Sequence, residues 1–264
     1  MTMTNGATPD SGQRLRLLSY NIQVGISSVR PHHYLTKSWK NLLPTPRRFE
    51  NLGRIAQVLR DHDIVGLQEL DAGSHRTGYI NLTEFLAHQA NYPFWHHQVN
   101  RAMGPIAQHG NGLLSRYRPT RIVEHKLPGL VPGRGALMAQ FGNNDEPLLV
   151  MMIHLSLGQR SRINQLAFVS EIINDYPHAI LMGDMNCAPS SPELAMLFRH
   201  TKLREPLEEH KTFPSWRPER SIDHILVTPE LKVETCQVLN YAFSDHLPIA
   251  MEITLPATIV MAAG

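Results

Sequence analysis

The chain has 264 residues, of which 42% are hydrophobic and 18% charged, a composition typical of an ordinary globular protein. Its formal net charge of +2 gives no global reason to expect binding to nucleic acid or to a membrane surface. Two cysteines, Cys187 and Cys236, are too few for a disulfide framework, although one bridge between them stays open. No apolar run approaches the ~18 residues of a membrane-spanning helix. We therefore expect a cytoplasmic protein.

The N-terminal segment differs in composition from the rest of the chain. Residues 1–13 are polar, include Gly, Pro and Ser, and lack the apolar core of a secretory signal, so we expect a disordered tail. The remainder shows no internal repeat, no low-complexity segment and no linker rich in Gly, Pro or Ser. Residues 14–264 are therefore predicted to form a single domain, long enough to bury a substantial core.

Hydrophobic patterning predicts the elements in chain order. Apolar runs bounded by turn residues predict strands, and apolar residues at helical spacing predict helices. Residues 25–46 have no clean periodicity and contain three prolines, which indicates a long loop. The predicted strands are 15–22, 63–69, 96–99, 110–115, 121–126, 136–141, 148–154, 179–184, 222–227, 233–239 and 248–255. The predicted helices are 47–61, 82–90, 160–174 and 192–200.

The segment 179–186 is the most informative stretch. An apolar run ends abruptly in Gly183-Asp184-Met185-Asn186, where glycine is expected to permit a sharp turn. Asp184 and Asn186 then place a carboxylate and an amide two residues apart at a sheet edge, where both could serve a metal ion and a polarised oxygen. Gly-Asp-x-Asn is also an ordinary way to leave a strand, so this motif alone is a modest signal.

Polar side chains recur at or beside the ends of several predicted strands. Each has an ordinary alternative, such as a turn former for Asn21, a surface carboxylate for Glu69, or a hydrogen-bonded core histidine for His154. Asp223 is harder to explain in this way, because a carboxylate inside an apolar strand is costly to bury unless it is paired. Oxygen ligands suit Mg²⁺ or Mn²⁺, and histidines beside carboxylates suit phosphate orientation and proton transfer. The set as a whole is Asn21, Glu69, His154, Asp184, Asn186, Asp223, Asp245 and His246.

Seven ordered motifs resemble those of the endonuclease/exonuclease/phosphatase superfamily, the DNase I-like enzymes. They span the chain from its first strand to its last, which makes them far more specific together than singly. The resemblance implies an α/β fold, a two-sheet α/β sandwich with helices on the outer faces and the site at one end between the sheets. The motifs are Ser19-Tyr20-Asn21-Ile22-Gln23, Gly66-Leu67-Gln68-Glu69, Gly110-Asn111-Gly112-Leu113-Leu114-Ser115-Arg116, His154-Leu155, Gly183-Asp184-Met185-Asn186, Ser221-Ile222-Asp223-His224-Ile225 and Ser244-Asp245-His246-Leu247-Pro248.

The resemblance also implies a divalent metal site. In the family pattern Glu69 corresponds to the main metal ligand, Asn21 lies beside it, and Asp245 approaches the ion. Carboxylate and amide oxygens without thiolates fit Mg²⁺, or Mn²⁺, as the expected cofactor.

The remaining matched residues correspond to catalytic positions. The family pattern implies that Asp184 positions or deprotonates the attacking water and that Asn186 contacts the phosphate. His154 is expected to donate to phosphate oxygens. His246 is expected to lie against the scissile phosphate, with Asp223 holding its tautomer. Either Asp184 or His246 could be the general base.

The chain departs from the family pattern at three positions. Some DNA-repair members carry an acidic residue where this chain has Gln23, and a tyrosine shortly before the central glycines, where this chain has His109. Both departures weaken an assignment as an abasic-site endonuclease. His224 stands where tyrosine or phenylalanine is more usual.

The implied function is divalent-metal-dependent hydrolysis of phosphoester bonds, most simply by a phosphodiesterase of nuclease-like chemistry. The alternatives are a hydrolase of phospholipid head groups or small phosphoesters and, more remotely, a non-catalytic binding scaffold, which the intact residue set disfavours. The expected partner is thus a phosphoester substrate, either nucleic acid or a phospholipid head group. We expect no stable protein partner and a monomer. The near-neutral charge argues mildly against an enzyme that tracks long DNA.

Selectivity is expected to reside in the loops. The loop at about residues 25–46, together with Arg47, Arg48 and Phe49 that follow it, interleaves basic and aromatic side chains, which could bind nucleic acid, an anionic membrane, or neither if it is simply a solvated loop. Further candidate loops are 71–80, 95–110 and 202–220. Arg101, Arg116 and Arg134 are additional candidates for phosphate binding.

Overall fold

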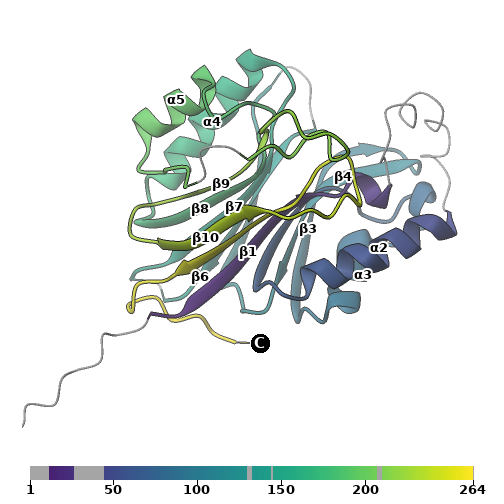
Figure 1. The fold of residues 1–264 in the computed structure, drawn as a ribbon, viewed down its shortest axis with the longest axis horizontal. Coiled ribbons are helices and arrows are strands. Elements are labelled where there is room, and N and C mark those ends of the chain that lie inside the picture. Colours follow the sequence, from purple (N-terminus) through teal and green to yellow (C-terminus); the bar gives the residue numbers. More distant parts are fainter. Residues whose placement is uncertain (1–11, 27–44, 130–132, 144, 207–209, 264) are drawn as a thin grey trace, which may run out of the picture.

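The computed structural model of the chain describes residues 12–26, 45–129, 133–143, 145–206 and 210–263. In these ranges the strands form two mixed sheets that pack face to face, with the order β10-β11-β1-β2-β4-β3 in one and β5-β6-β7-β8-β9 in the other (Figure 1). The pairs β1–β2 and β7–β8 are parallel, and the other neighbours are antiparallel. The strands are β1 (Arg14–Asn21), β2 (Ile64–Asp71), β3 (Phe94–Met103), β4 (Ala107–Ser115), β5 (Arg121–Lys126), β6 (Gly135–Phe141), β7 (Leu148–His154), β8 (His178–Asp184), β9 (Asp223–Val227), β10 (Lys232–Val238) and β11 (Ile249–Thr254).

The helices cover the outer faces of the two sheets. Helices α2 (Pro46–Leu59) and α3 (Leu82–Ala90) lie on the six-stranded sheet, and α4 (Gln159–Ile173) and α5 (Pro192–His200) lie on the five-stranded sheet (Figure 1). Short 3-10 turns occupy Gln23–Gly25 and His75–Thr77. The two-sheet α/β sandwich predicted from the sequence is therefore confirmed. None of the described helices is long and apolar enough to span a bilayer.

Three hydrophobic layers hold the sandwich together, because successive strand residues point to opposite faces of a sheet. In β1, Leu15 and Leu17 face the other sheet, whereas Leu18 and Tyr20 face helices α2 and α3. Leu181 of β8 likewise packs against α4 and α5. Both faces of each sheet are thus apolar, which explains why these strands read as nearly continuous hydrophobic runs.

The predicted elements agree closely with the observed ones where side-chain signals mark their ends. Asn81 accepts hydrogen bonds from the backbone N–H groups of Thr83 and Glu84 and so caps α3, and the Ser191 hydroxyl caps α5 by accepting from Leu194 N. Both helices have the predicted bounds. The loop over 27–44 lies outside the described residues, and so does the predicted tail up to residue 11.

Some finer expectations are changed by the structure. Cys187 and Cys236 are free thiols, so the bridge left open by the sequence is not formed. Gly183 is not in a turn but inside β8, where its φ is 142° and a Cβ atom would lie 1.9 Å from the carbonyl oxygen of Ile153 on β7. The glycine is therefore needed for the close approach of two parallel strands. At the end of the expected tail, Gln13 is held by hydrogen bonds to Tyr117 and Leu255.

Candidate active site

Four predicted site residues lie on the inward-facing row of their strands, at the same end of the sandwich. Asn21 ends β1, His154 ends β7, Asp184 ends β8, and Asp223 begins the antiparallel strand β9. In the five-stranded sheet, Asp184 is in register with His154 on one side and with Asp223 on the other. The amide of Asn21 then reaches Asp184 from the opposite sheet. The fold alone therefore brings these polar ends together.

Asp184 is the centre of this arrangement. Its Oδ2 accepts a hydrogen bond from Nδ2 of Asn21 at 3.1 Å, and lies 3.5 Å from Nε2 of His154 and 3.8 Å from Nε2 of His246. Its Oδ1 accepts from the backbone N–H of Asn186 at 3.0 Å. Burial, followed by the nearby charge of Asp223, raises the pKa of Asp184 to about 7. A carboxylate with such a pKa can exchange a proton near neutral pH.

Asp223 and His246 form a buried pair beside it. Nδ1 of His246 lies 2.8 Å from Oδ2 of Asp223, which also accepts from the hydroxyl of Thr212 at 2.5 Å. The ring of Phe213 packs 4.9 Å from the imidazole, centroid to centroid. Burial opposes charge on the imidazole, but Asp223 and then Asp184 outweigh it and raise the pKa of His246 to about 10. The imidazole is thus held as a cation between two carboxylates.

Glu69 reaches the site through a break in strand β2. Regular alternation would place Glu69 on the helix-facing side with Val65 and Leu67. The register of β2 with β4 shifts between Leu67 and Leu70, and Glu69 has a φ of 55°, the mark of a β-bulge that re-aims a side chain. Its Oε1 consequently accepts from Nδ2 of Asn21 at 3.3 Å.

The surroundings of Glu69 suit a hard cation. Burial, and then the negative charge of Asp245, raise the pKa of Glu69. Asp245 itself is buried, and its backbone carbonyl accepts from Ser215 N at 2.7 Å. Two neighbouring carboxylates supply oxygen ligands beside the Asn21 amide, and a divalent ion there would offset the repulsion between the two acids. The residues present therefore fit Mg²⁺ or Mn²⁺.

The cluster of Asp184, Asp223 and His246 is better explained by proton transfer than by metal binding. Asp184, Asp223 and His246 place one ligand atom each within 4.8 Å of one another. Nδ1 of His246 is committed to Asp223, however, and the raised pKa of the imidazole disfavours the neutral form that a metal requires. This group therefore resembles an acid–base unit.

Asn186 lies at the edge of the site. Its φ is 53°, and its Nδ2 donates to the carbonyl of Leu155 at 3.0 Å, which ties the turn after β8 to the turn after β7. Its backbone N–H supports Asp184, as described above. The contact with phosphate expected of Asn186 stays a prediction.

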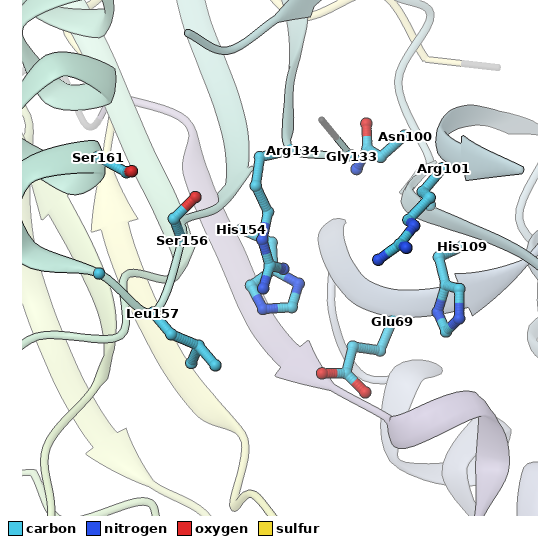
Figure 2. Close-up of a pocket in the computed structure, with 12 residues that line it drawn as sticks. Glu69, Asn100, Arg101, His109, Gly133, Arg134, His154, Ser156, Leu157 and Ser161 are labelled. Atoms are coloured by element: carbon cyan, nitrogen blue, oxygen red, sulfur yellow. The ribbon is translucent and has the colours of Figure 1, made fainter. Parts of the chain in front are cut away.

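A cavity of about 510 Å³ opens next to Glu69 and His154 (Figure 2). Figure 2 shows the guanidinium of Arg101 reaching toward the space between these two residues, with Arg134 drawn along His154 and His109 on the side of Glu69 away from His154. Arg101 comes from β3 and Arg134 from the segment before β6. Burial, and then the charge of Arg76, lower the pKa of His109 to about 4, so this imidazole is neutral. The cationic wall of the cavity is therefore provided by the two arginines.

Sequence reasoning placed one arginine wrongly and missed part of the cavity wall. Arg116 donates from Nε to the carbonyl of His62 at 3.1 Å and covers the ring of Tyr92, so it does not line the cavity. Arg48 and Phe49, assigned to the basic-aromatic loop, belong to α2, where Phe49 packs 5.5 Å from Phe85. The wall also includes Ser156, Leu157, Gly158 and Ser161, whose only sequence signal is that they closely follow His154.

Comparison with known proteins agrees with this geometry. A model of the endonuclease/exonuclease/phosphatase family matches residues 18–246, from the first strand to His246. The chain belongs to this family. Escherichia coli YbhP is 27% identical to it over 222 residues, covering 73% of this chain and 83% of YbhP.

Solved structures show the same fold. A family member from Bacteroides thetaiotaomicron superposes with a TM-score of 0.72 at 19% identity, covering 93% of this chain and 99% of its own. A mannosyl-6-phosphatase from the same organism gives a TM-score of 0.69 at 19% identity, covering 91% of this chain and 100% of its own. The family consists of hydrolytic phosphoesterases.

Proposed function

We propose that the chain is a divalent-metal-dependent phosphoester hydrolase that uses Asp184, His246 and His154 for chemistry. The observation that carries the proposal is the convergence on Oδ2 of Asp184 of two imidazole Nε2 atoms, at 3.5 and 3.8 Å, and of the amide of Asn21. A buried carboxylate surrounded by donors, with a cation site next to it, is suited to water activation and to charge stabilisation at phosphorus.

Glu69, Asn21 and Asp245 are the residues that would hold Mg²⁺ or Mn²⁺. A bound divalent ion supplies positive charge against the phosphoryl oxygens as negative charge develops on them. Glu69 is the strongest candidate ligand, because the bulge in β2 turns its carboxylate toward Asn21 and the cavity.

The side chains of the chain divide the proton transfers between them. Asp184 accepts the proton of the attacking water, since both nitrogens of His246 face carboxylates and favour the imidazolium. His246, oriented by Asp223 as in other carboxylate–imidazole pairs, donates a hydrogen bond to a phosphoryl oxygen and then its Nε2 proton to the departing oxygen, which leaves as an alcohol. The proton taken up by Asp184 from water restores the imidazolium across the 3.8 Å contact between them. His154, buried and therefore held neutral, donates a hydrogen bond from its ring, and Asn186 contacts the phosphate.

The substrate class has two candidates. The sequence motifs favour a phosphodiester and nuclease-like chemistry. A compact phosphomonoester is the second candidate, because the cavity of about 510 Å³ has Arg101 and Arg134 on its wall and could match the two charges of a terminal phosphate. A mannosyl-6-phosphatase among the fold neighbours gives this second candidate a precedent in the same architecture.

A substrate panel with controlled metal tests the proposal. The purified chain would be dialysed against EDTA, then assayed with Mg²⁺ or Mn²⁺ on single- and double-stranded DNA, RNA, phospholipids, sugar phosphates and an aryl phosphodiester. We expect no turnover without metal, restored turnover with either ion, and a higher metal requirement for Glu69→Ala. Full activity in metal-free buffer would refute metal dependence. Inactivity on every phosphoester would favour the scaffold alternative.

A further inference from the structure

A second cluster of metal-ligating side chains lies outside the catalytic site. It consists of Glu205, His210 and His224, which are outside the set assigned to catalysis above. His224 follows Asp223 in β9, so strand alternation directs it to the opposite face of the sheet, the face on which Leu226 packs toward the α4–α5 layer. The side chains of His224, His210 and Glu205 are only 0%, 1% and 11% exposed.

The three donor atoms form a nearly regular triangle. Nδ1 of His224 lies 3.0 Å from Oε1 of Glu205 and 3.3 Å from Nε2 of His210, and Nε2 of His210 lies 3.4 Å from Oε1 of Glu205. Two ligands bound to Zn²⁺ at ~2.0–2.1 Å with a tetrahedral angle between them are separated by roughly 3.3 Å. The observed separations are thus those of ligands around one small cation.

We propose that Glu205, His210 and His224 bind one Zn²⁺ ion, distinct from the catalytic ion and with a structural role. Two imidazoles and one carboxylate are a known ligand set for zinc, and imidazole favours zinc over Mg²⁺ or Ca²⁺. Three protein ligands leave the fourth tetrahedral position for a water molecule, an arrangement more common at catalytic than at structural zinc. The structural role is inferred from the burial of the three side chains and from their position away from the cavity beside Glu69. This inference goes beyond the proposed phosphoester hydrolysis and does not depend on it.

The support around His224 agrees with metal ligation. Its second ring nitrogen, Nε2, lies 2.8 Å from the carbonyl oxygen of Cys187. A hydrogen bond of this kind places the proton on Nε2 and leaves the Nδ1 lone pair facing Glu205 and His210, which is the usual arrangement for a metal-bound histidine. The rings of His210 and His224 are almost perpendicular, at 87°, so both can direct a nitrogen toward one point.

The alternative is a buried ion pair between a protonated His224 and Glu205. Burial opposes charge on the ring, but the hydrogen bond and the charge of Glu205 outweigh it and raise the pKa of His224, so the ion pair is the metal-free form of the cluster. Both carboxylate oxygens lie within hydrogen-bonding distance of Nδ1, at 3.0 and 3.1 Å. Protons on Nδ1 of His224 and on Nε2 of His210 satisfy both contacts with Glu205 but leave two N–H donors facing each other at 3.3 Å, whereas a cation among the three donor atoms satisfies all three contacts.

The position of the cluster suggests what the ion would do. Glu205 and His210 belong to the long connection between α5 and β9, and this connection also carries Thr212 and Phe213, which contact Asp223 and His246. An ion bound to this connection and to β9 fixes the connection against the strand. Zn²⁺ would therefore stabilise the fold and hold the Asp223–His246 pair in place without touching substrate.

Zinc binding by the full chain tests the proposal directly. The chain would be stripped with a chelator, titrated with Zn²⁺ against a chromophoric competitor, and its bound metal measured by mass spectrometry. We expect one tight site that survives a large excess of Mg²⁺. We also expect X-ray absorption at the zinc edge to show two imidazole ligands, and Zn²⁺ to raise the Tm in proportion to its occupancy.

Matched variants separate this site from the catalytic one. His210→Ala should weaken Zn²⁺ binding by at least about 10²-fold, because loss of even an outer partner of a ligand costs 10–100-fold. His178→Ala is the control, since His178 is also a buried histidine and pairs with Glu146, at 3.9 Å, but belongs to no metal-ligating cluster among the described residues. Glu69→Gln should likewise retain Zn²⁺ while its Mg²⁺ requirement changes.

Several outcomes would overturn the proposal. They are failure of the wild-type chain to bind Zn²⁺ tightly, equal zinc affinity in His210→Ala and wild type, and a zinc edge without imidazole scattering. The first of these would identify the cluster as an ion pair only. Because the binding, spectroscopic and Tm measurements on wild type need no substitution, misfolding of His210→Ala would not rescue or refute the idea. None of these readouts requires the phosphoester assay.

Discussion

Replacing Asp223 by Asn should disable catalysis while leaving substrate binding nearly intact. Asp223 lies 2.8 Å from Nδ1 of His246, their side chains are 2% and 6% exposed, and Asp223 does not line the cavity beside Glu69. Loss of the carboxylate that orients a catalytic imidazole lowers turnover by up to about 10⁴-fold, and a positioned proton-transfer group contributes about 10²–10⁴-fold. The expected fall in kcat is therefore about 10²–10⁴-fold, with little change in KM.

A pH–rate profile and a double-mutant cycle test whether the fall in kcat comes from loss of the Asp223–His246 pair. The carboxylates of Asp223 and Asp184 outweigh burial and hold the pKa of His246 near 10. Asp223→Asn should therefore move the limb of the pH–rate profile that reports the His246 imidazole to lower pH, toward the ordinary histidine pKa of about 6.5. The measurement is steady-state turnover of an aryl phosphodiester with saturating Mg²⁺. Asp223→Asn combined with His246→Ala should be scarcely worse than His246→Ala alone, because the two residues act as a unit.

Asp63→Asn provides a matched control for this experiment. Asp63 is also a buried aspartate in an ion pair, with Arg16 at 3.2 Å, but it precedes β2 at the end opposite Glu69. Its replacement should leave kcat unchanged. Fully additive losses in the cycle, or an unmoved pH limb, would refute the pairing argument and show that Asp223 holds metal or the sheet instead.

The central carboxylate, the cavity wall and a buried ion pair each give a further prediction. Asp184→Asn should lower kcat by about 10²–10⁴-fold with an unchanged circular dichroism spectrum, and near-normal turnover would remove it from the mechanism. Arg134→Ala should lower kcat/KM by about 10–10²-fold, as expected for a lost bond to a charged group, whereas Arg116→Ala should be silent. Arg76→Ala should lower the free energy of unfolding by about 3–5 kcal/mol in urea titrations, because Arg76 and Asp71 are 7% and 0% exposed. Burial opposes ionisation of Asp71, but hydrogen bonds from Gln108 N and Arg76 outweigh burial and lower the pKa of Asp71. The ionised carboxylate therefore stabilises the fold above pH ~4, and this stabilisation is lost as the pH falls through the lowered pKa. The pH dependence of the free energy of unfolding in this range should vanish in Asp71→Asn.

The sequence was sufficient for most of the fold because its signals are local. The apolar row of α3 is bounded by a capping Asn81, and that of α5 by Ser191, so both ends of each helix could be predicted from neighbouring residues. The polar residues after apolar runs were equally visible. His154 and Asp184 come together because β7 and β8 are parallel and in register, which places both carboxyl ends at one edge.

Other parts of the site depend on tertiary structure. Simple alternation places Glu69 on the wrong face of β2, and only the shifted register with β4 turns it inward. Arg116 lies between Ser115 and Tyr117, and Arg134 lies between two glycines, but neither setting indicates that the first binds a carbonyl of the chain and the second lines the cavity. The position of each arginine depends on which loops come together across the two sheets, and the hydrophobic periodicity of the sequence does not predict that.

Strand β9 connects the Asp223–His246 pair with the Glu205–His210–His224 cluster, because its successive side chains point to opposite faces of the sheet. Asp223 points between the sheets, where it orients His246, and the next residue, His224, points outward to Glu205 and His210. The connection that carries Glu205 and His210 returns to the inner face through Thr212, which donates to Asp223. Changes at the outer cluster must therefore reach the inner pair through one strand and one connection. It follows that loss of His210 should loosen the hydrogen bond from Thr212 and lower kcat before it affects substrate binding, because neither side chain lines the cavity.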